Sequence, residues 1–178
     1  GLHGPDILFY YHVLTNNKVN AVGFGTHARP AKEFFAPAKA AVEKGGAPAF
    51  AYLVGFLCHF ALDVTCHSYI ENKIAVSDVR HTEIESEFDR FLLGKDGKEP
   101  LSAKLTGHIF PTAENAHVIA PFFAGLTEKQ IRKSLRSMIT CNEFVRAPHA
   151  FKRFLVNTVL HLSGNWKEMH GMMIAKQP

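Results

Sequence analysis

The sequence predicts an all-α protein, and three features carry this prediction. Apolar residues recur at helical spacing over long stretches, Gly and Pro separate these stretches, and alternating β-branched patterns of useful length are absent. With 178 residues, 47% of them apolar, the chain can bury one sizeable core, so we expect a single multi-helix domain over residues 1–178. Because the chain starts abruptly inside a turn motif, we also expect a natural N-terminus further upstream.

The first helices are expected after an opening turn. Gly4-Pro5-Asp6 is a turn signal that leads into an aromatic run. Segment 31–44 is rich in Ala, Lys and Glu and ends at Gly45-Gly46, which indicates a helix and its stop. Pro48 then opens an apolar helix that we expect to reach about Ile70, because Pro is favoured in the first turn of a helix.

The second half of the chain contains signals for further helices. Asp78 is a reasonable N-cap for a helix that runs to Leu93 and stops at the following glycine. A helix broken by two prolines is expected over 106–124, and Thr127-Glu-Lys-Gln130 is a capping-box pattern at the start of the next one. The last long helix is expected over 147–162.

Composition restricts the classes of partner and compartment. The 20 basic and 16 acidic residues give a net charge of +4, a mild bias that predicts no specific nucleic-acid partner. Three cysteines are too few for a disulfide framework and favour a reducing, cytoplasmic location. We find neither a leader sequence nor an apolar run of about 20 residues, so a soluble chain is expected. Secretion stays an alternative if an N-terminal segment has been removed.

Three polar residues recur every four positions on the apolar helix. Because residues i and i+4 share a helix face, His59, Asp63 and His67 form one polar stripe. Burying two imidazoles and a carboxylate is costly without partners, and a metal ion satisfies these groups directly. Gly55 lies one turn earlier on the same stripe, where a missing side chain is expected to leave room for a ligand or metal.

The next helix supplies a second pair with the same spacing. His81 and Glu85 lie four residues apart and can bind one ion on the face that meets the first helix. The alternative for these residues is a set of hydrogen-bonded core histidines with a solvated glutamate. Five such residues on two helices favour the metal interpretation.

These motifs resemble a known family. The pattern Gly55-Phe-Leu-Cys-His-Phe-Ala-Leu-Asp-Val-Thr-Cys-His67, followed fourteen residues later by His81-Thr-Glu-Ile-Glu85, resembles the zinc-dependent phospholipase C family. Gly4-Pro5-Asp6 and His27 also match, and the resemblance covers roughly residues 1–93. In that family, and in the structurally similar zinc nucleases that cut single strands, three zinc ions lie in a cleft of an α-helical domain.

The resemblance implies a ligand set, carried over residue by residue. One zinc would be held by Asp6, His27, His59 and Asp63, and a second by His67, His81 and Glu85. Asp63 would also bridge to a third ion. In the secreted relatives that ion is completed by an N-terminal Trp and a nearby His, and neither is recognisable here. Two departures therefore mark this chain. The Trp and His of the third site are not recognisable, so two or three zinc ions are expected, and the next histidine follows Asp63 at a spacing of four positions where the secreted enzymes use six.

The implied activity is phosphodiester hydrolysis by a zinc-activated water, with Asp6 and Asp63 as the catalytic residues. The expected substrate is a phospholipid or another phosphodiester. A different class is a non-catalytic, zinc-stabilised helical module, which would hold a closed structural ion. A di-iron bundle is suggested by Glu114-x-x-His117, but that architecture needs two such pairs. An HD-type phosphohydrolase requires a His-Asp dipeptide that this chain lacks.

One helix also carries a basic stripe. Its members share a helix face through their i, i+3, i+4 and i+7 spacing: Lys129, Arg132, Lys133 and Arg136. A solvated helix face is the usual interpretation of such a stripe. The functional alternative is peripheral contact with an anionic membrane or another phosphate-rich partner.

Overall fold

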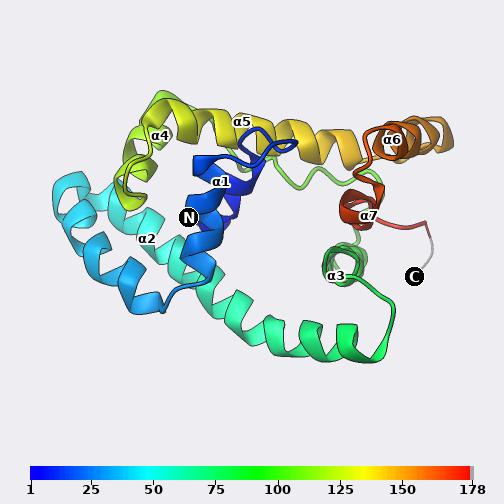
Figure 1. The fold of residues 1–178 in the computed structure, drawn as a ribbon, viewed down its shortest axis with the longest axis horizontal. Coiled ribbons are helices and arrows are strands. Elements are labelled where there is room, and N and C mark those ends of the chain that lie inside the picture. Colours follow the sequence, from blue (N-terminus) through cyan, green and yellow to red (C-terminus); the bar gives the residue numbers. More distant parts are fainter. Residues whose placement is uncertain (177–178) are drawn as a thin grey trace. The chain divides into compact units, whose positions relative to one another are not determined.

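The computed structural model describes residues 1–176, and within this range every regular element is a helix (Figure 1), which confirms the all-α class. In chain order the elements are η1 (Gly4–Tyr10), α1 (Lys18–His27), α2 (Ala31–Val76), α3 (His81–Lys95), α4 (Ala113–Ile119), η2 (Ala120–Phe122), α5 (Glu128–Val145), α6 (Ala150–Leu162), α7 (Trp166–Met169) and η3 (His170–Met172).

The chain forms two compact units. The first unit comprises Gly1–Val64 and Ile109–Thr140, and the second comprises Thr65–His108 and the residues from Cys141 onward. Helices α2 and α5 each contribute residues to both units. Each unit has its own cluster of buried apolar side chains, so each can be described by itself. The single domain expected from chain length stays a prediction.

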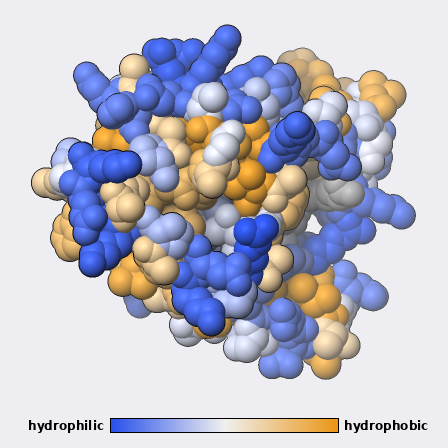
Figure 2. Space-filling view, turned by 60° about the vertical axis from the view of Figure 1, so that its left-hand side comes forward, coloured by the Kyte–Doolittle hydropathy of each residue, from blue (hydrophilic) through white to orange (hydrophobic). Residues whose placement is uncertain are grey.

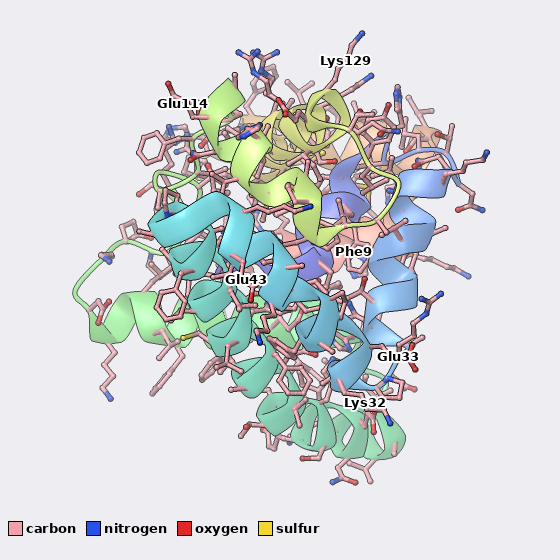
Figure 3. All side chains as sticks on the ribbon, turned by 90° about the vertical axis from the view of Figure 1, so that its left-hand side faces the viewer. Phe9, Lys32, Glu33, Glu43, Glu114 and Lys129 are labelled. Carbon is pink, nitrogen blue, oxygen red and sulfur yellow. The ribbon has the colours of Figure 1, made fainter. Side chains whose placement is uncertain are left out.

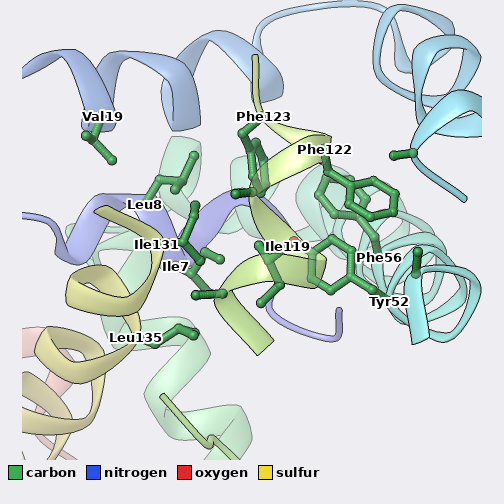
Figure 4. Packing of buried hydrophobic residues seen from close by; sticks show 14 of the residues in the cluster. Ile7, Leu8, Val19, Tyr52, Phe56, Ile119, Phe122, Phe123, Ile131 and Leu135 are labelled. Atoms are coloured by element: carbon green, nitrogen blue, oxygen red, sulfur yellow. The ribbon is translucent and has the colours of Figure 1, made fainter. Parts of the chain in front are cut away.

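The core of the first unit is aromatic and aliphatic (Figure 4). Phe56 of α2 stacks on Phe34 of the same helix with ring centroids 3.8 Å apart, across the kink that divides α2. Phe122 at the end of η2 and Phe123 directly after it pack near this pair, and Ile131 of α5 is fully buried. Burial of each such side chain contributes about 1.5–3 kcal/mol. This core therefore fixes η1, α2 and α5, which carry or adjoin the polar residues of interest.

Two expected helix boundaries are confirmed. Gly46 has φ 62° and ψ −146° inside α2, so two helical segments meet there, as the Gly45-Gly46 stop followed by Pro48 predicts. At the start of α5, the Thr127 N–H donates to Gln130 Oε1 at 2.9 Å, and the Gln130 N–H donates to Thr127 Oγ1 at 3.3 Å. This reciprocal pair is the capping box expected from the sequence.

The structure corrects several other boundaries. The glycine-punctuated stretch before Ala31 contains α1, because Asn17 Oδ1 caps two backbone N–H groups at its start. Helix α2 continues past Ile70 to Val76, α3 begins after Arg80 rather than Asp78 and ends at Lys95, and α6 begins at Ala150 rather than 147.

The helix expected over 106–124 is also shorter in the structure. It is confined to α4, with η2 directly after it. Thr112 Oγ1 accepts the Asn115 N–H at 3.1 Å and so starts the helix after Pro111. The second proline expected to break the helix, Pro121, lies within η2.

The second unit has a smaller core beside a stacked aromatic group. Val156 and Leu160 of α6 are buried, and Trp166 of α7 packs against them. The Trp166 ring lies between two histidine rings, with centroids 4.1 Å from His161 and 4.7 Å from His170, both nearly parallel to it. The C-terminal helices are thereby tied to α6.

Figure 2 shows hydrophobic side chains among polar ones on one face of the molecule. Helix α2 is one of the elements that leave hydrophobic side chains at the surface. Phe50, Leu57 and Leu62 are 58%, 51% and 61% exposed, although the sequence pattern suggests a buried apolar helix. By length and composition α2 could cross a membrane, where the sequence pattern predicts no span. Core helices of soluble proteins meet the same criteria of length and composition.

Candidate metal centre

Asp6 and His27 are positioned by the packing of η1 against α1. The buried Asn20 side chain of α1 donates hydrogen bonds to the backbone oxygens of Leu8 at 2.7 Å, Phe9 at 3.1 Å and Tyr11 at 3.0 Å. A Cβ added to Gly23 would lie 2.9 Å from Phe9 Cε1, so the two elements approach as closely as a glycine allows. Asp6 in η1 and His27 at the end of α1 are therefore held on a tightly tied pair of elements.

His59 of α2 completes this group through two close backbone approaches. Gly4 has φ +47°, and a Cβ there would lie 2.1 Å from His59 Cδ2, so the ring occupies the space of a side chain. A Cβ on Gly55 would lie 3.0 Å from Gly1 Cα and 3.1 Å from Leu2 N. The space above Gly55 is thus filled by backbone. The expectation that Gly55 leaves room for a ligand or metal is wrong.

These three residues form the first cluster, defined as Asp6, His27 and His59. Their donor atoms all lie within 4.8 Å of one another. Asp6 Oδ1 is 3.1 Å from His27 Nε2 and 4.0 Å from His59 Nε2. One carboxylate oxygen thus faces two imidazole nitrogens, and this donor set is one that zinc prefers.

The first cluster is also electrostatically suited to a cation. The His59 side chain is only 13% exposed, and its Nε2 is buried with no hydrogen-bond partner among the described residues. Burial lowers the pKa of His59, the Asp63 carboxylate acts in the raising direction, and His27 acts in the lowering direction. A neutral imidazole with an open lone pair is the form that binds a metal, so the residues present fit zinc.

Asp63 lies on α2 one turn beyond His59, within the first unit. Its carboxylate is close enough to influence the pKa of His59. It is not among the three residues whose donor atoms converge. Its assignment as a fourth ligand therefore stays a prediction from the helical spacing and the resemblance.

The second cluster, defined as His67, His81 and Glu85, lies in the second unit. The rings of His67 and His81 have centroids 5.1 Å apart and are inclined by 56°. His81 Nε2 is 2.9 Å from Glu85 Oε1, across one turn of α3. These side chains are 38–52% exposed. The structure thus brings the predicted residues together, but less tightly than in the first cluster.

Glu71 is a neighbour that the sequence interpretation missed. Its Oε1 lies 3.8 Å from His67 Nδ1, one turn further along α2. The sequence did contain a pattern that indicates this contact, because His67 and Glu71 have the same i, i+4 spacing as the pair on α3. Glu71 is thereby a further carboxylate beside the second cluster.

The C-terminal segment holds the helix that carries His81 and Glu85. Ser86 Oγ donates to the Gly171 backbone oxygen at 2.6 Å. A Cβ on Gly171 would lie 2.6 Å from Thr82 Oγ1 and 3.1 Å from Glu83 N, so only glycine permits this approach. The position and orientation of α3 therefore depend on a residue 85 positions later in the chain.

The di-iron alternative finds no support in the described residues. His117 Nδ1 lies 2.7 Å from Glu128 Oε1, and both side chains are exposed. A surface ion pair accounts for this histidine without Glu114.

The comparisons with known proteins agree with this geometry at the level of the family. The sequence model described as zinc dependent phospholipase C matches residues 4–136, a span that includes every residue of both clusters. No curated protein and no solved structure matches the chain. The match covers well over half of the 178 residues. The chain therefore belongs to the zinc-dependent phospholipase C family, which makes zinc the implied metal and hydrolysis the implied class of reaction.

Proposed function

We propose that the chain is a zinc-dependent phosphodiester hydrolase that acts on a phospholipid headgroup bond. The observation that carries the proposal is the convergence of the Asp6, His27 and His59 donor atoms within 4.8 Å, in a chain whose family depends on zinc. The proposed ligands are Asp6, His27, His59 and Asp63 for one ion, and His67, His81 and Glu85 for another. Two ions are proposed, and a third would need ligands beyond these.

Zinc bound at the first cluster would supply an acidified water and positive charge for the phosphoryl oxygens. The residues of the chain position the metal and move the proton. His59, kept neutral by burial, presents a buried Nε2 lone pair and fixes one side of the site. The Asp6 side chain is 37% exposed, although its Oδ1, which faces the two imidazoles, is buried. Its other carboxylate oxygen could therefore accept a proton from an attacking water.

Asp63 and the second cluster have separate roles in this proposal. The Asp63 charge beside His59 offsets the positive charge that a metal brings, and its loss would weaken metal binding. His81 and Glu85 would hold a second ion from one helix face, with His67 as a further ligand. Hydrolysis would release an alcohol and a phosphomonoester. Phospholipid is the substrate that the family supports, and another phosphodiester would satisfy the same residues.

The test combines metal content with activity. Protein expressed with added zinc and never exposed to chelator is expected to hold at least two zinc equivalents and to hydrolyse a chromogenic phosphodiester or a phosphatidylcholine analogue. Chelation should abolish hydrolysis, and zinc should restore it. Asp6→Asn is expected to remove activity, because it removes the candidate base and a ligand together.

The matched control for this test is Asp96→Asn. Asp96 is an exposed carboxylate paired with Lys98 and lies in the second unit. This variant is expected to behave as wild type. Zinc binding that stabilises the protein without any hydrolysis would refute the proposal and establish the non-catalytic, zinc-stabilised module in its place.

A further inference from the structure

A turn between η1 and α1 lies against the exposed side of α5, within the first unit (Figure 1). Lys133 Nζ of α5 donates to His12 Nε2 at 2.8 Å and lies 5.5 Å above the Tyr11 ring. His12 has φ 48°, which turns the chain sharply at this point. The residues that follow are thereby placed beside the basic stripe of α5.

This turn displays two hydrophobic side chains at its tip. Val13 is 42% exposed and Leu14 is 68% exposed. The turn itself is tied, because Asn17 Nδ2 donates to the Tyr11 oxygen at 2.8 Å and to the Thr15 oxygen at 2.9 Å. Exposure of the two apolar side chains is therefore a fixed property of the turn and is not caused by a lack of local structure.

The adjoining side of α5 is strongly cationic. Lys129, Lys133 and Arg136 are exposed on successive turns, while Ile131 and Leu135 on the opposite side are buried in the core. Arg132 differs from the other cations because its Nε donates to the Pro111 oxygen at 3.0 Å. The segment Glu128–Thr140 contains these four cationic residues and one acidic residue, Glu128. A surface of this charge attracts phosphate-rich partners.

We propose that this surface docks the protein onto an anionic phospholipid bilayer. The docking face is defined as Val13, Leu14, Lys129, Lys133 and Arg136. A bilayer satisfies both parts of it, because headgroup phosphates attract the cations while the interfacial region accepts the apolar tip. Nucleic acid offers phosphates but no apolar layer for Leu14. The inference rests on the proposed function, since it concerns where that hydrolase meets its lipid.

Vesicle co-sedimentation of the zinc-loaded protein tests the docking face. Vesicles of phosphatidylcholine with phosphatidylglycerol are expected to bind more protein than vesicles of phosphatidylcholine alone, and added salt should weaken the binding. Removing two cations in K129Q/R136Q should lower partitioning about 30-fold. Leu14→Ser should lower it about tenfold through lost apolar burial.

The control removes the same charge elsewhere in the first unit. K32Q/K39Q alters two exposed lysines of α2, and Figure 3 shows Lys129 at the top of the view and Lys32 in its lower part. The K32Q/K39Q variant should bind vesicles as wild type does, apart from a small loss of binding due to its lower net charge. Equal losses in the two double variants, or no preference of wild type for anionic vesicles, would overturn the docking face. So would binding to a single-stranded oligonucleotide that is as tight as vesicle binding and insensitive to Leu14→Ser.

Hydrolysis of a soluble chromogenic phosphodiester separates this inference from the proposed function. None of the altered side chains belongs to either cluster, so every variant should retain the wild-type rate on that substrate. Lost vesicle binding with intact soluble activity is the expected outcome for the docking variants. A wild-type protein that binds vesicles but lacks zinc-dependent hydrolysis would refute the proposed function and would still support the docking face.

Discussion

The two clusters are built in different ways. The first cluster draws on η1, α1 and α2, and two glycines allow the backbone and the His59 ring to approach within the distance of a missing side chain. The second cluster draws on α2 and α3, with more exposed side chains and a simple i, i+4 pair. Close backbone packing thus brings donor atoms of three elements within 4.8 Å of one another. In the second cluster, helical spacing accounts only for the His81–Glu85 pair, and His67 approaches this pair from α2. We therefore expect the first cluster to be better organised before metal binds.

The largest effect is expected from Asp63→Asn. This change removes the carboxylate charge beside His59 and a proposed ligand of the first ion, so hydrolysis of a chromogenic phosphodiester should be abolished, as is also expected for Asp6→Asn. Helical circular dichroism should be retained, because the substitution keeps shape and helix face. The measurement is the rate with saturating zinc, compared with the helical signal of the same sample.

Glu83→Gln is the matched control for Asp63→Asn. Glu83 lies on α3 between the two ligand positions but on another helix face. The Glu83→Gln variant should hydrolyse the chromogenic phosphodiester at nearly the wild-type rate. If the two variants lose activity alike, Asp63 has no special role in the first cluster.

Metal content should distinguish the two clusters directly. His59→Ala and His81→Ala are each expected to lose one zinc equivalent by elemental analysis. Zinc at 100 times its dissociation constant stabilises by about 2.7 kcal/mol, or about 5–11 °C in melting temperature for a chain of this size. The decrease in melting temperature should be larger for His59→Ala, because the ion of the first cluster joins three elements. Equal melting temperatures with and without chelator in wild type would contradict this expectation.

A smaller and selective effect is expected from Gly171→Val. A side chain at this position collides with Thr82 and the Glu83 backbone, so α3 must shift and carry His81 and Glu85 with it. Zinc affinity at the second cluster should fall about tenfold, and the first cluster should keep its ion. Gly94→Ala, also on α3 but with open space around it, serves as the control. Titration calorimetry of the zinc-free proteins measures both sites.

The smallest effect concerns the pH dependence of the zinc-free protein. Because the folded pKa of His59 is lowered, the unfolded chain binds the proton more readily. This contribution to the free energy of unfolding is fully present above the ordinary histidine pKa near 6.5 and is lost as the pH falls through the lowered folded value. Urea unfolding of wild type and His59→Gln at several pH values should show a shallower decline in the variant.

The sequence predicts the helical class and much of the candidate site for a physical reason. Helical spacing is a local property, so the stripe from His59 to His67 and the pair on α3 could be read from residue intervals. The capping box at Thr127 is equally local. Helix α1 was missed because its glycines weaken the helical pattern. Its stability comes from the Asn17 cap and from the contacts of Asn20 with η1, which helical spacing does not reveal.

The other failures concern contacts between residues far apart in sequence. Space above Gly55 could not be assigned to backbone rather than to a ligand, because the approaching residues lie some fifty positions away. The support of α3 by Gly171 is of the same kind. Asp6 and His27 carry no helical spacing to one another, so only the resemblance pointed to them. Residue intervals alone predict which residues are neighbours on one helix. They do not predict which distant segment packs against that helix.

Trp166 is the only tryptophan of the chain, and its place between two histidine rings in the second unit has a spectroscopic consequence. Its emission reports on that unit alone, while helical circular dichroism reports on both. Thermal unfolding followed by the two signals therefore measures whether the units melt together. Coincident transitions would make the chain one cooperative folding unit, and separated transitions would mean that the two clusters belong to regions that can open independently.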